Sequence, residues 1–600
     1  MEKKGVLPKR DEIPEKFRWK LEDIYSGDDL WEQDFKLVRE MMGGMDSYRG
    51  RLGESAGVLL EALGLQDRIQ ELIEKVYTYA RMRKDEDNAN NTYQALTDRA
   101  EALNTRAMTA LSFIVPEILS LPAETLERFI NENPDLQLYR FAIEELVRQK
   151  PHTLSPAEEK IIALAGDVAA APAGIFRMLN NADISFPPIA DEEGKEVEVT
   201  HGRYARLLES RDRRVRRDAF TSIYSSYRKL KNTMASTLNS SVKKDIFYAS
   251  ARNYPSALEA SLFADNIPVE VYDNLIKTVR ENLGSMHRYV ALRKKLLGLD
   301  ELHMYDLYVP MVRDLIWEIP YSEAVKMVME GLNPLGPEYC GIASKGFDSG
   351  WVDVYENRGK TSGAYSWGPY GVHPYILMNY QDNLNNVFTL AHEMGHAMHS
   401  YYSYREQPHV YAHYRIFTAE VASTVNESLL MEHLLKTVTG RDKRLYLINH
   451  YLEQFRGTVF RQTMFAEFEK IIHARAEAGE ALTPVYLCGE YRRLNKDYYG
   501  PDMIVDDDIE LEWARIPHFY TAFYVYKYAT GFSAAAALTR RILEEGRPAV
   551  SSYLDFLKKG DSDYPLNLLK TAGVDMTTPL PVRDALGLFT RLLDQLEENL

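Results

Sequence analysis

Residues 391–399, which read Ala-His-Glu-Met-Gly-His-Ala-Met-His, constrain the fold more than any other stretch of the chain. They contain the pattern H-E-x-x-H. On an α-helix with 3.6 residues per turn, His392 and His396 lie one turn apart on nearly the same face. Two imidazoles in this arrangement can share one metal ion, and Glu393 can reach a water bound to it. The motif therefore predicts a helix here, and another element that brings a third ligand to it.

The composition is that of a large globular protein. A chain of 600 residues can form several ordinary domains or one large helical body with lobes. Hydrophobic residues make up 45% and charged residues 27% of the sequence, which is typical of soluble proteins. The net charge of -16 argues against sequence-independent binding of nucleic acid, because that needs a basic surface. It does not argue against peptide ligands.

The sequence favours a cytoplasmic location without a membrane partner. No run approaches the roughly 18–20 apolar residues that span a bilayer. The first ten residues carry charges with no apolar core behind them, so they do not predict a signal peptide. Two cysteines, Cys340 and Cys488, are too few for a disulfide framework, which fits a reducing compartment.

Apolar periodicity predicts a mainly α fold with short strands. Between residues 67 and 84, for example, Ile69, Leu72, Val76 and Tyr79 recur at helical spacing. Comparable patterns predict further helices at residues 91–113, 156–169, 204–247, 272–297, 321–332, 417–436, 445–478 and 511–545.

Two breaks interrupt the helical pattern. Residues 184–201 hold Pro187, Pro188 and an acidic run, which indicates a small hairpin or linker and a domain boundary near 190–205. Residues 347–380 are rich in Gly and Tyr and end in an apolar run at 373–380 that predicts a strand. That strand belongs either to a surface hairpin or to the border of an active-site cleft, and the sequence alone favours neither.

The third metal ligand must come from another segment, because catalytic zinc usually takes three protein ligands and one water. The metzincin pattern would need glycine at 399 and histidine at 402. The chain has His399 and Tyr402, so that class is excluded. Glu420 and Glu427 are two helical turns apart on the helix predicted at 417–436 and share one face. Either can be the ligand, with the other supporting an imidazole, unless both are ordinary exposed acids.

Candidate donors for a reaction intermediate concentrate at residues 515–531. Tyr520, Tyr524 and Tyr528 recur every four residues and form a stripe if the segment is helical. Such stripes usually serve core packing, and a histidine such as His518 is usually a partly buried structural residue. The residues alone leave both interpretations open.

The remaining histidines give weaker signals. His399 follows His392 by about two turns, which allows supporting contact, but packing is the favoured role. The spacing of His409, His413 and His433 does not demand a metal, so we assign these residues structural roles.

Residues 417–427, which read Phe-Thr-Ala-Glu-Val-Ala-Ser-Thr-Val-Asn-Glu, resemble the third-ligand motif of the thimet oligopeptidase-like zinc peptidases. The bacterial oligoendopeptidase F branch is the closer match. Residues 19–25 resemble the lead-in of that family, and residues 363–366 and 371–380 resemble the strand region before its zinc helix. Together these segments cover nearly the whole chain.

The resemblance implies a role for each site residue. Glu420 joins His392 and His396 as a ligand of one Zn²⁺ per chain, Glu427 supports them, and Glu393 is the general base.

The resemblance also implies that His518 and Tyr524 stabilise the tetrahedral intermediate, with Tyr528 binding substrate. The spacing from His518 to Tyr524 is one residue longer than in the thimet branch, so the choice among Tyr520, Tyr524 and Tyr528 stays open. His373 and Tyr375 are expected to bind substrate where a peptide pairs with the strand at 373–380.

The implied protein is a zinc-dependent endopeptidase of short, unstructured peptides. The resemblance implies a large helical body with a deep substrate channel and a small β-sheet region near the site. The boundary indicated near 190–205 divides the chain into an N-terminal helical domain at 1–195, of the oligoendopeptidase F type, and a catalytic domain at 196–600. The alternatives are another metal, such as Mn²⁺ or Co²⁺, and a noncatalytic helical peptide-binding protein with a structural metal. Structural zinc normally has four protein ligands, often cysteines, and neither cysteine neighbours the histidine pair. Cleavage preference and oligomeric state are not encoded in any motif.

Overall fold

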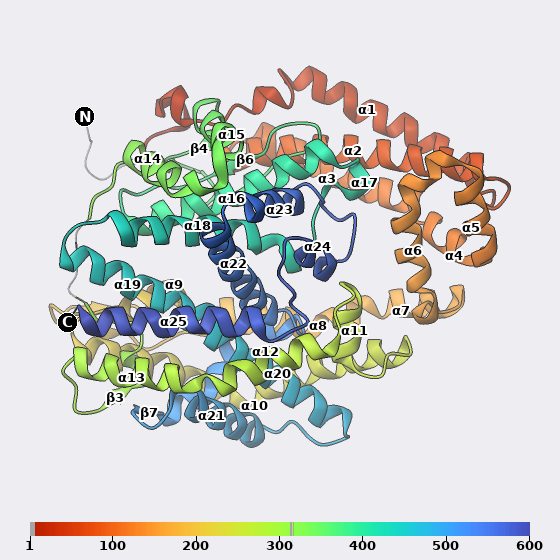
Figure 1. Cartoon of the computed structure of the whole chain (residues 1–600). Helices are drawn as coiled ribbons and strands as arrows, with labels where there is room; N and C mark the ends of the chain where they lie inside the picture. The colour runs from red at the N-terminus through yellow and green to blue at the C-terminus, as the bar shows by residue number, and fades with distance from the viewer. Residues whose placement is uncertain (1–6, 313–314, 316, 600) are drawn as a thin grey trace. The chain divides into compact units, whose positions relative to one another are not determined.

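The computed structural model describes residues 7–312, 315 and 317–599 (Figure 1). Long helices and strands of only two or three residues confirm the predicted mainly α fold. The chain divides into two compact units. The first unit comprises Met1–Pro151, Trp317–His433 and Leu538–Gly573, and the second comprises His152–Ile316, Leu434–Ala537 and Val574–Leu600. The linear division at 195/196 stays a prediction.

The first unit holds the N-terminal helices, the helix with the H-E-x-x-H motif and a three-stranded sheet. Its helices are α1 (Asp28–Met45), α2 (Ala56–Glu86), α3 (Asn91–Leu111), α4 (Ile114–Ser120), α5 (Ala123–Glu132), α6 (Arg140–Arg148), α14 (Tyr321–Leu332), α15 (Gly336–Asp348), α16 (Leu384–Glu406), α17 (His409–Ala412), α23 (Arg547–Leu557) and α24 (Pro565–Thr571). Two further helices, α18 (Ile416–Thr437) and α22 (Tyr526–Glu545), contribute residues to both units.

Helices α1, α2 and α3 pack side by side and form much of the core of the first unit (Figure 1). Ser55 is the N-cap of α2, and its side chain accepts a hydrogen bond from the Val58 N–H. Asn90 caps the N-terminus of α3 in the same way. The predicted apolar face of α2 is buried, including Ile69, Val76 and Tyr79. Burying one such side chain stabilises the fold by about 1.5–3 kcal/mol. The sequence periodicity therefore identified the face that packs.

The sheet of the first unit has the order β4-β6-β5. The central strand, β6 (Tyr375–Leu377), pairs in parallel with β4 (Val352–Asp353) and antiparallel with β5 (Tyr365–Trp367). Helix α16 packs on β5 and β6. The strand predicted at 373–380 is therefore present and buried, and it is not a surface hairpin. Because both edges of β6 are already paired, a peptide cannot pair with β6.

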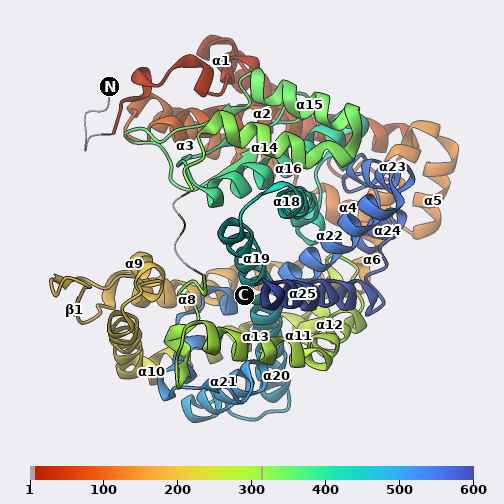
Figure 2. The ribbon, with the colours of Figure 1, turned by 60° about the vertical axis from the view of Figure 1, so that its left-hand side comes forward.

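The second unit is a helical assembly around the 39-residue helix α10 (Arg213–Ala251). Helix α10 packs against α20 (Arg461–Glu477) and α21 (Pro484–Tyr499), and these two helices also contact each other (Figure 1, Figure 2). The other helices of this unit are α7 (Pro156–Leu164), α8 (Gly166–Met178), α9 (His201–Leu208), α11 (Ala257–Phe263), α12 (Val269–Glu281), α13 (Leu283–Leu296), α19 (Arg441–Phe455) and α25 (Leu580–Glu598).

Short strands of the second unit lie in connecting segments. Strands β1 (Ile189–Ala190) and β2 (Glu196–Val197) form the hairpin predicted from the prolines and valines of that region. Strands β3 (Leu302–His303) and β7 (Met503–Ile504) pair in parallel. The helix predicted at 445–478 is divided into α19 and α20 by a π-helical turn, Arg456–Phe460.

One helical stretch of the second unit differs from the sequence-based expectation. Residues Pro156–Asp183, 28 in all, are long and apolar enough to cross a membrane, with a mean hydropathy of 1.5 and 11% of the apolar window buried. We expected no such segment, because no run of the sequence approaches the roughly 18–20 apolar residues that span a bilayer. Helices of soluble proteins also meet this test, so the stretch by itself assigns no membrane.

Candidate metal centre

The predicted helix around the H-E-x-x-H motif is α16. It begins after Asn383, whose side chain accepts the Asn386 N–H. His392 and His396 project from the same face, and their Nε2 atoms are 3.2 Å apart. Glu393, between them in sequence, is buried. The helix therefore provides two neighbouring imidazoles and a carboxylate shielded from water.

Helix α18 approaches α16 at Gly395 so closely that a side chain would not fit. A Cβ at Gly395 would lie 2.5 Å from the Ser423 Cα and 2.6 Å from the Ala422 carbonyl oxygen. Near this crossing, Asn426 Nδ2 donates to the Ala391 carbonyl oxygen at 3.2 Å. The two helices lie side by side in both views (Figure 1, Figure 2). Glycine at 395 thus permits the backbone contact that brings acidic residues of α18 to the histidine pair.

We predict that Gly395→Ala destabilises the protein by about 1–3 kcal/mol, because the added methyl group must displace backbone atoms of α18. The same displacement should weaken metal binding. Urea unfolding and zinc titration measure the two effects. Gly64→Ala is the control, because Gly64 lies in α2 with nothing within 4 Å of an added Cβ; it should be neutral or stabilising. If Gly395→Ala behaves like the control, the close contact does not set the site geometry.

Three ligand atoms meet where α16 and α18 cross. Glu420 Oε2 lies 3.4 Å from His392 Nε2 and 3.6 Å from His396 Nε2. With the separation of 3.2 Å between the two nitrogens, these distances form a nearly regular triangle. Zinc bonds of about 2.0–2.1 Å in a tetrahedron place neighbouring ligand atoms about 3.3–3.4 Å apart. The His₂Glu set therefore fits a zinc ion.

Glu427 lies on the other side of the His392 ring. Its Oε1 is 2.6 Å from His392 Nδ1, the nitrogen that does not face Glu420. The two glutamates that the sequence left as alternatives thus contact opposite nitrogens of one imidazole. A carboxylate that accepts Nδ1–H fixes the tautomer and leaves Nε2 free for a metal.

The charges at this cluster match the needs of a cation. Hydrogen bonds with His392 and His396 hold the pKa of Glu420 well below its usual range, so the carboxylate is ionised at neutral pH. Burial lowers the pKa of His392, but hydrogen bonds with Glu420 and Glu427 outweigh it and raise that pKa. A metal must therefore displace a proton from this imidazole to bind.

Glu393 has the properties of a general base. Burial raises the pKa of its carboxyl group above the usual value. Its Oε2 is buried and has no hydrogen-bond partner among the described residues. A carboxylate with a raised pKa and a free oxygen is suited to take a proton near neutral pH.

The predicted helix over 511–545 is wrong in its first part. Residues Asp507–Arg515 and Pro517–Tyr520 form 3₁₀-helices, and α22 begins only at Tyr526. The tyrosines at 520, 524 and 528 therefore do not form a stripe on one helix. Phe523, between them, has a positive φ of 56°, and its N–H donates to the buried Oε1 of Glu469 at 3.0 Å. This distant carboxyl group holds a backbone conformation that a helix would not allow.

Within the second unit, His518, Tyr524 and Tyr528 form one aromatic cluster. The centroid of the His518 ring lies 6.2 Å from the ring centroid of Tyr524 and 6.0 Å from that of Tyr528. The centroids of the two tyrosine rings are 5.4 Å apart. Tyr520 instead stacks on Phe176 at 4.3 Å and is buried. Tyr524 and Tyr528 are half-buried. The geometry therefore separates Tyr520 from the other two candidates.

The segment before His518 is held by a buried ion pair in the second unit. Glu512 is 2.5 Å from Arg461 and 2.8 Å from Arg515. Burial alone would raise the pKa of Glu512, but these two arginines lower it to about 2. Burial lowers the pKa of His518, and Arg461 adds to that effect, so His518 is neutral at pH 7. A neutral imidazole still offers one N–H as a donor.

The other predicted residues of the first unit have structural contacts. Tyr375 is fully buried, and its hydroxyl donates to the Lys20 carbonyl oxygen at 3.1 Å, so no surface is left for direct contact with a peptide. His373 stacks on Trp351 and contacts Asp23 at 3.1 Å. His399 stacks on Tyr414 at 3.8 Å, and burial lowers its pKa to about 3, which fits the packing role.

Comparison with known proteins identifies the family. The family model described as Peptidase family M3 matches residues 206–588, and a second model, described as Oligopeptidase F, matches residues 117–186. The chain is 52% identical over 598 residues to Oligopeptidase PepF of Bacillus subtilis, covering 100% of this chain and 89% of that protein. The chain belongs to peptidase family M3.

Two further relatives of this M3 peptidase match it over nearly the whole chain. Group B oligopeptidase PepB of Streptococcus agalactiae is 42% identical over 588 residues, or 98% of each chain. The crystal structure of oligoendopeptidase-F from Enterococcus faecium is 40% identical, with a TM-score of 0.74, and the match covers 95% of this chain and 99% of that one. The resemblance inferred from short motifs is thereby confirmed.

Sequence reasoning missed two supporting residues of this M3 peptidase. Gly395 lies inside the motif, and a small residue between two ligands could have indicated a close helix contact. Glu469 gave no signal, because its partner Phe523 is 54 residues away in the sequence.

Proposed function

We propose that this M3 peptidase is a zinc-dependent endopeptidase that hydrolyses internal bonds of short, unstructured peptides. The supporting observation is the triangle formed by the Nε2 atoms of His392 and His396 and the Oε2 of Glu420, with sides of 3.2, 3.4 and 3.6 Å. These three residues would hold one Zn²⁺ per chain. The ion, when bound, would lower the pKa of a water to about 7 and polarise the scissile carbonyl group.

Two glutamates would assist the reaction: one would transfer the proton of the water, and the other would orient the imidazole of His392. Glu393 would take the proton of the attacking water and pass it to the departing amine, which its raised pKa and free Oε2 support. Glu427 would hold the tautomer and angle of His392 through Nδ1. Such a supporting residue tunes the site without contacting the substrate.

His518 and Tyr524 would donate hydrogen bonds to the oxyanion of the tetrahedral intermediate. Both residues belong to the second unit, and a developing oxyanion needs such hydrogen-bond donors. Their rings, with that of Tyr528, form one cluster whose tyrosines are half-buried. Tyr528 would contact the bound peptide beside them.

We predict that Tyr524→Phe lowers kcat by about 10²–10³-fold, the usual effect of removing one oxyanion donor. Tyr520→Phe should leave kcat unchanged, because Tyr520 is buried against Phe176. Steady-state hydrolysis of an internally quenched peptide measures both. If Tyr520→Phe loses activity and Tyr524→Phe does not, the oxyanion donor is Tyr520.

The substrate is proposed from the chemistry of the family and the sheet of the first unit. Oligopeptidase relatives imply peptide substrates. An extended peptide would pair with the outer edge of β5 (Tyr365–Trp367), since the central strand β6 has no free edge. A cytoplasmic location, as expected from the two unpaired cysteines, is part of the same proposal.

A chelator assay tests the proposal against a noncatalytic peptide-binding protein. Removing metal with 1,10-phenanthroline should abolish hydrolysis of a quenched peptide of about ten residues, and added Zn²⁺ should restore it. Mn²⁺ and Co²⁺ are tested in parallel, because His₂Glu sites accept several ions. Chelator-resistant hydrolysis, or peptide binding without hydrolysis at any metal, would contradict the proposal.

A further inference from the structure

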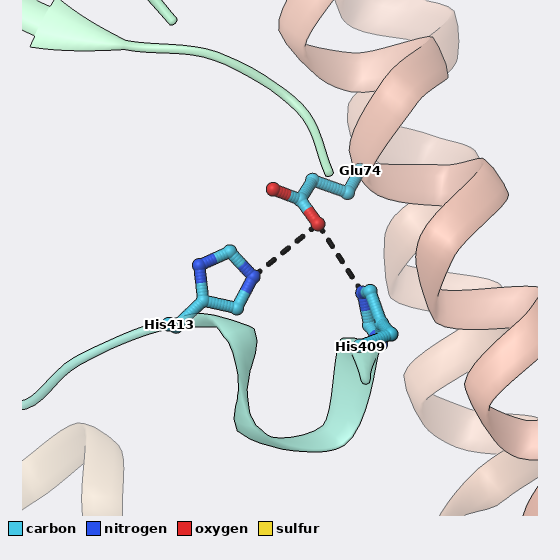
Figure 3. A group of neighbouring side chains, drawn as sticks. All are labelled: Glu74, His409 and His413. Atoms are coloured by element: carbon cyan, nitrogen blue, oxygen red, sulfur yellow. Dashed lines mark hydrogen bonds and ion pairs between the residues drawn. The ribbon is translucent and has the colours of Figure 1, made fainter. Parts of the chain in front are cut away.

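A second cluster of metal-ligating side chains lies in the first unit. Glu74 projects from α2, His409 begins α17, and His413 follows the end of α17 (Figure 3). Both imidazoles contact the same carboxylate oxygen: Glu74 Oε2 is 3.2 Å from His409 Nε2 and 3.3 Å from His413 Nε2. The three ligand atoms all lie within 4.8 Å of one another.

We propose that Glu74, His409 and His413 bind a second transition-metal ion of the Zn²⁺ class, separate from the His392 cluster. The inference does not rest on the proposed peptidase function. Tetrahedral zinc separates neighbouring ligand atoms by about 3.3–3.4 Å, and the two measured separations are 3.2 and 3.3 Å. The histidine and glutamate ligands are also those of the first candidate site, where the corresponding separations are 3.2–3.6 Å.

The carboxylate of Glu74 is poorly satisfied by protein groups alone. Its Oε2 contacts two imidazoles, whereas its Oε1 is buried without a hydrogen-bond partner in the described part of the chain. A buried carboxylate oxygen without a donor costs free energy. A bidentate carboxylate on a metal, or a water bound to that metal, would use this oxygen.

The charge of the cluster favours a cation. Burial raises the pKa of Glu74, but hydrogen bonds with His409 and His413 outweigh burial and lower it, so the carboxylate is ionised. A divalent metal held between this carboxylate and the two imidazoles would supply the positive charge that the carboxylate attracts.

Neighbouring aromatic rings orient the two imidazoles, and one side of the cluster is open. The hydroxyl of Tyr404 lies 3.5 Å from His413 Nδ1, and Tyr370 packs edge-on against His409 at 5.4 Å. Side-chain exposure is 15% for Glu74, 12% for His409 and 54% for His413. An ion can therefore enter beside His413 and meet two ligands that are already held in place.

The position of the cluster suggests what the ion would do. Helix α17 lies in the connection between α16, which carries His392 and His396, and α18, which carries Glu420. A metal bound by His409, His413 and Glu74 would crosslink this connection to α2. We therefore assign the second ion a structural role: it would stabilise the segment that joins the two helices of the first site.

Zinc stoichiometry of the full chain tests the inference. Equilibrium dialysis against buffered free Zn²⁺, followed by elemental analysis, should give two equivalents for the wild type and one for His413→Ala. Because His413 is largely exposed, this variant should fold. His433→Ala is the control: His433 lies 3.5 Å from Glu330, belongs to neither candidate metal cluster, and its variant should still bind two equivalents. The affinity of the lost site should fall by more than the roughly 10–100-fold expected for removing a supporting residue.

A Glu420→Ala background separates this inference from the proposed function. In that background Zn²⁺ should raise Tm, because an ion that binds only the folded chain stabilises it, and His413→Ala should abolish the increase. The inference is supported if Glu420→Ala binds one equivalent of zinc and the double variant Glu420→Ala/His413→Ala binds none. This result does not depend on whether the first site is catalytic. A wild type that binds no more zinc than His413→Ala at saturating Zn²⁺ would overturn the inference and leave the proposed function intact.

Discussion

Glu393→Gln should retain zinc and lose peptide hydrolysis by about 10³-fold or more. A general base contributes about 10²–10⁴ to the rate, and the amide of glutamine cannot accept a proton at neutral pH. Glutamine has nearly the shape of glutamate, so the buried pocket around residue 393 should stay intact. The kcat for a quenched peptide and the metal content of the same sample are the two measurements.

Glu406→Gln is the matched control for this variant. Glu406 also belongs to α16, but it is partly exposed and pairs with Arg405 at 3.2 Å. It should keep the wild-type rate. Full activity in Glu393→Gln would show that another group takes the proton, and the proposed mechanism would then be wrong.

Glu420→Ala and Glu427→Ala should affect metal binding differently: the first should abolish it at the first site, and the second should only weaken it. Glu420 is beside both Nε2 atoms, so its removal should abolish stoichiometric metal at the first site and all hydrolysis. Glu427 contacts only Nδ1 of His392. Removing such a supporting carboxylate weakens metal binding or activity by about 10–100-fold. Zinc titrations at buffered free metal measure the difference.

The opposite result in these zinc titrations would exchange the roles assigned to Glu420 and Glu427. If Glu427→Ala loses the metal and Glu420→Ala keeps it, Glu427 is the ligand and Glu420 the support. Equal losses in both variants would mean that α18 needs both carboxylates for its packing, which urea unfolding of each variant would reveal.

The sequence predicted elements that depend on local pattern. The helix predicted at 321–332 coincides with α14, and the H-E-x-x-H helix, the second helix with its two glutamates, and the hairpin near residue 190 are all present. In each of these elements, the spacing of apolar residues, the capping residues or the prolines that specify the structure all lie within a segment of about 20 residues.

Elements that depend on distant contacts could not be predicted in this way. The tyrosines at 520, 524 and 528 have helical spacing, but the Glu469 carboxyl group holds Phe523 at positive φ and delays the helix until Tyr526. The central position of β6 depends on pairing with two other strands. The spacing of His409 and His413 favours structural roles, and it gives no sign of their common partner Glu74, which is 335 residues from His409 in the sequence.

The zinc content of His413→Ala and of the double variant His413→Ala/Glu420→Ala tests the central claim most directly. With the Glu74 cluster disabled, the His392 cluster is the one candidate metal site left among the residues that the structure describes. The proposed metal centre predicts one equivalent of zinc in His413→Ala and none in the double variant, measured at the same buffered free Zn²⁺. One equivalent in both proteins would contradict the assignment of His392, His396 and Glu420 as the zinc ligands.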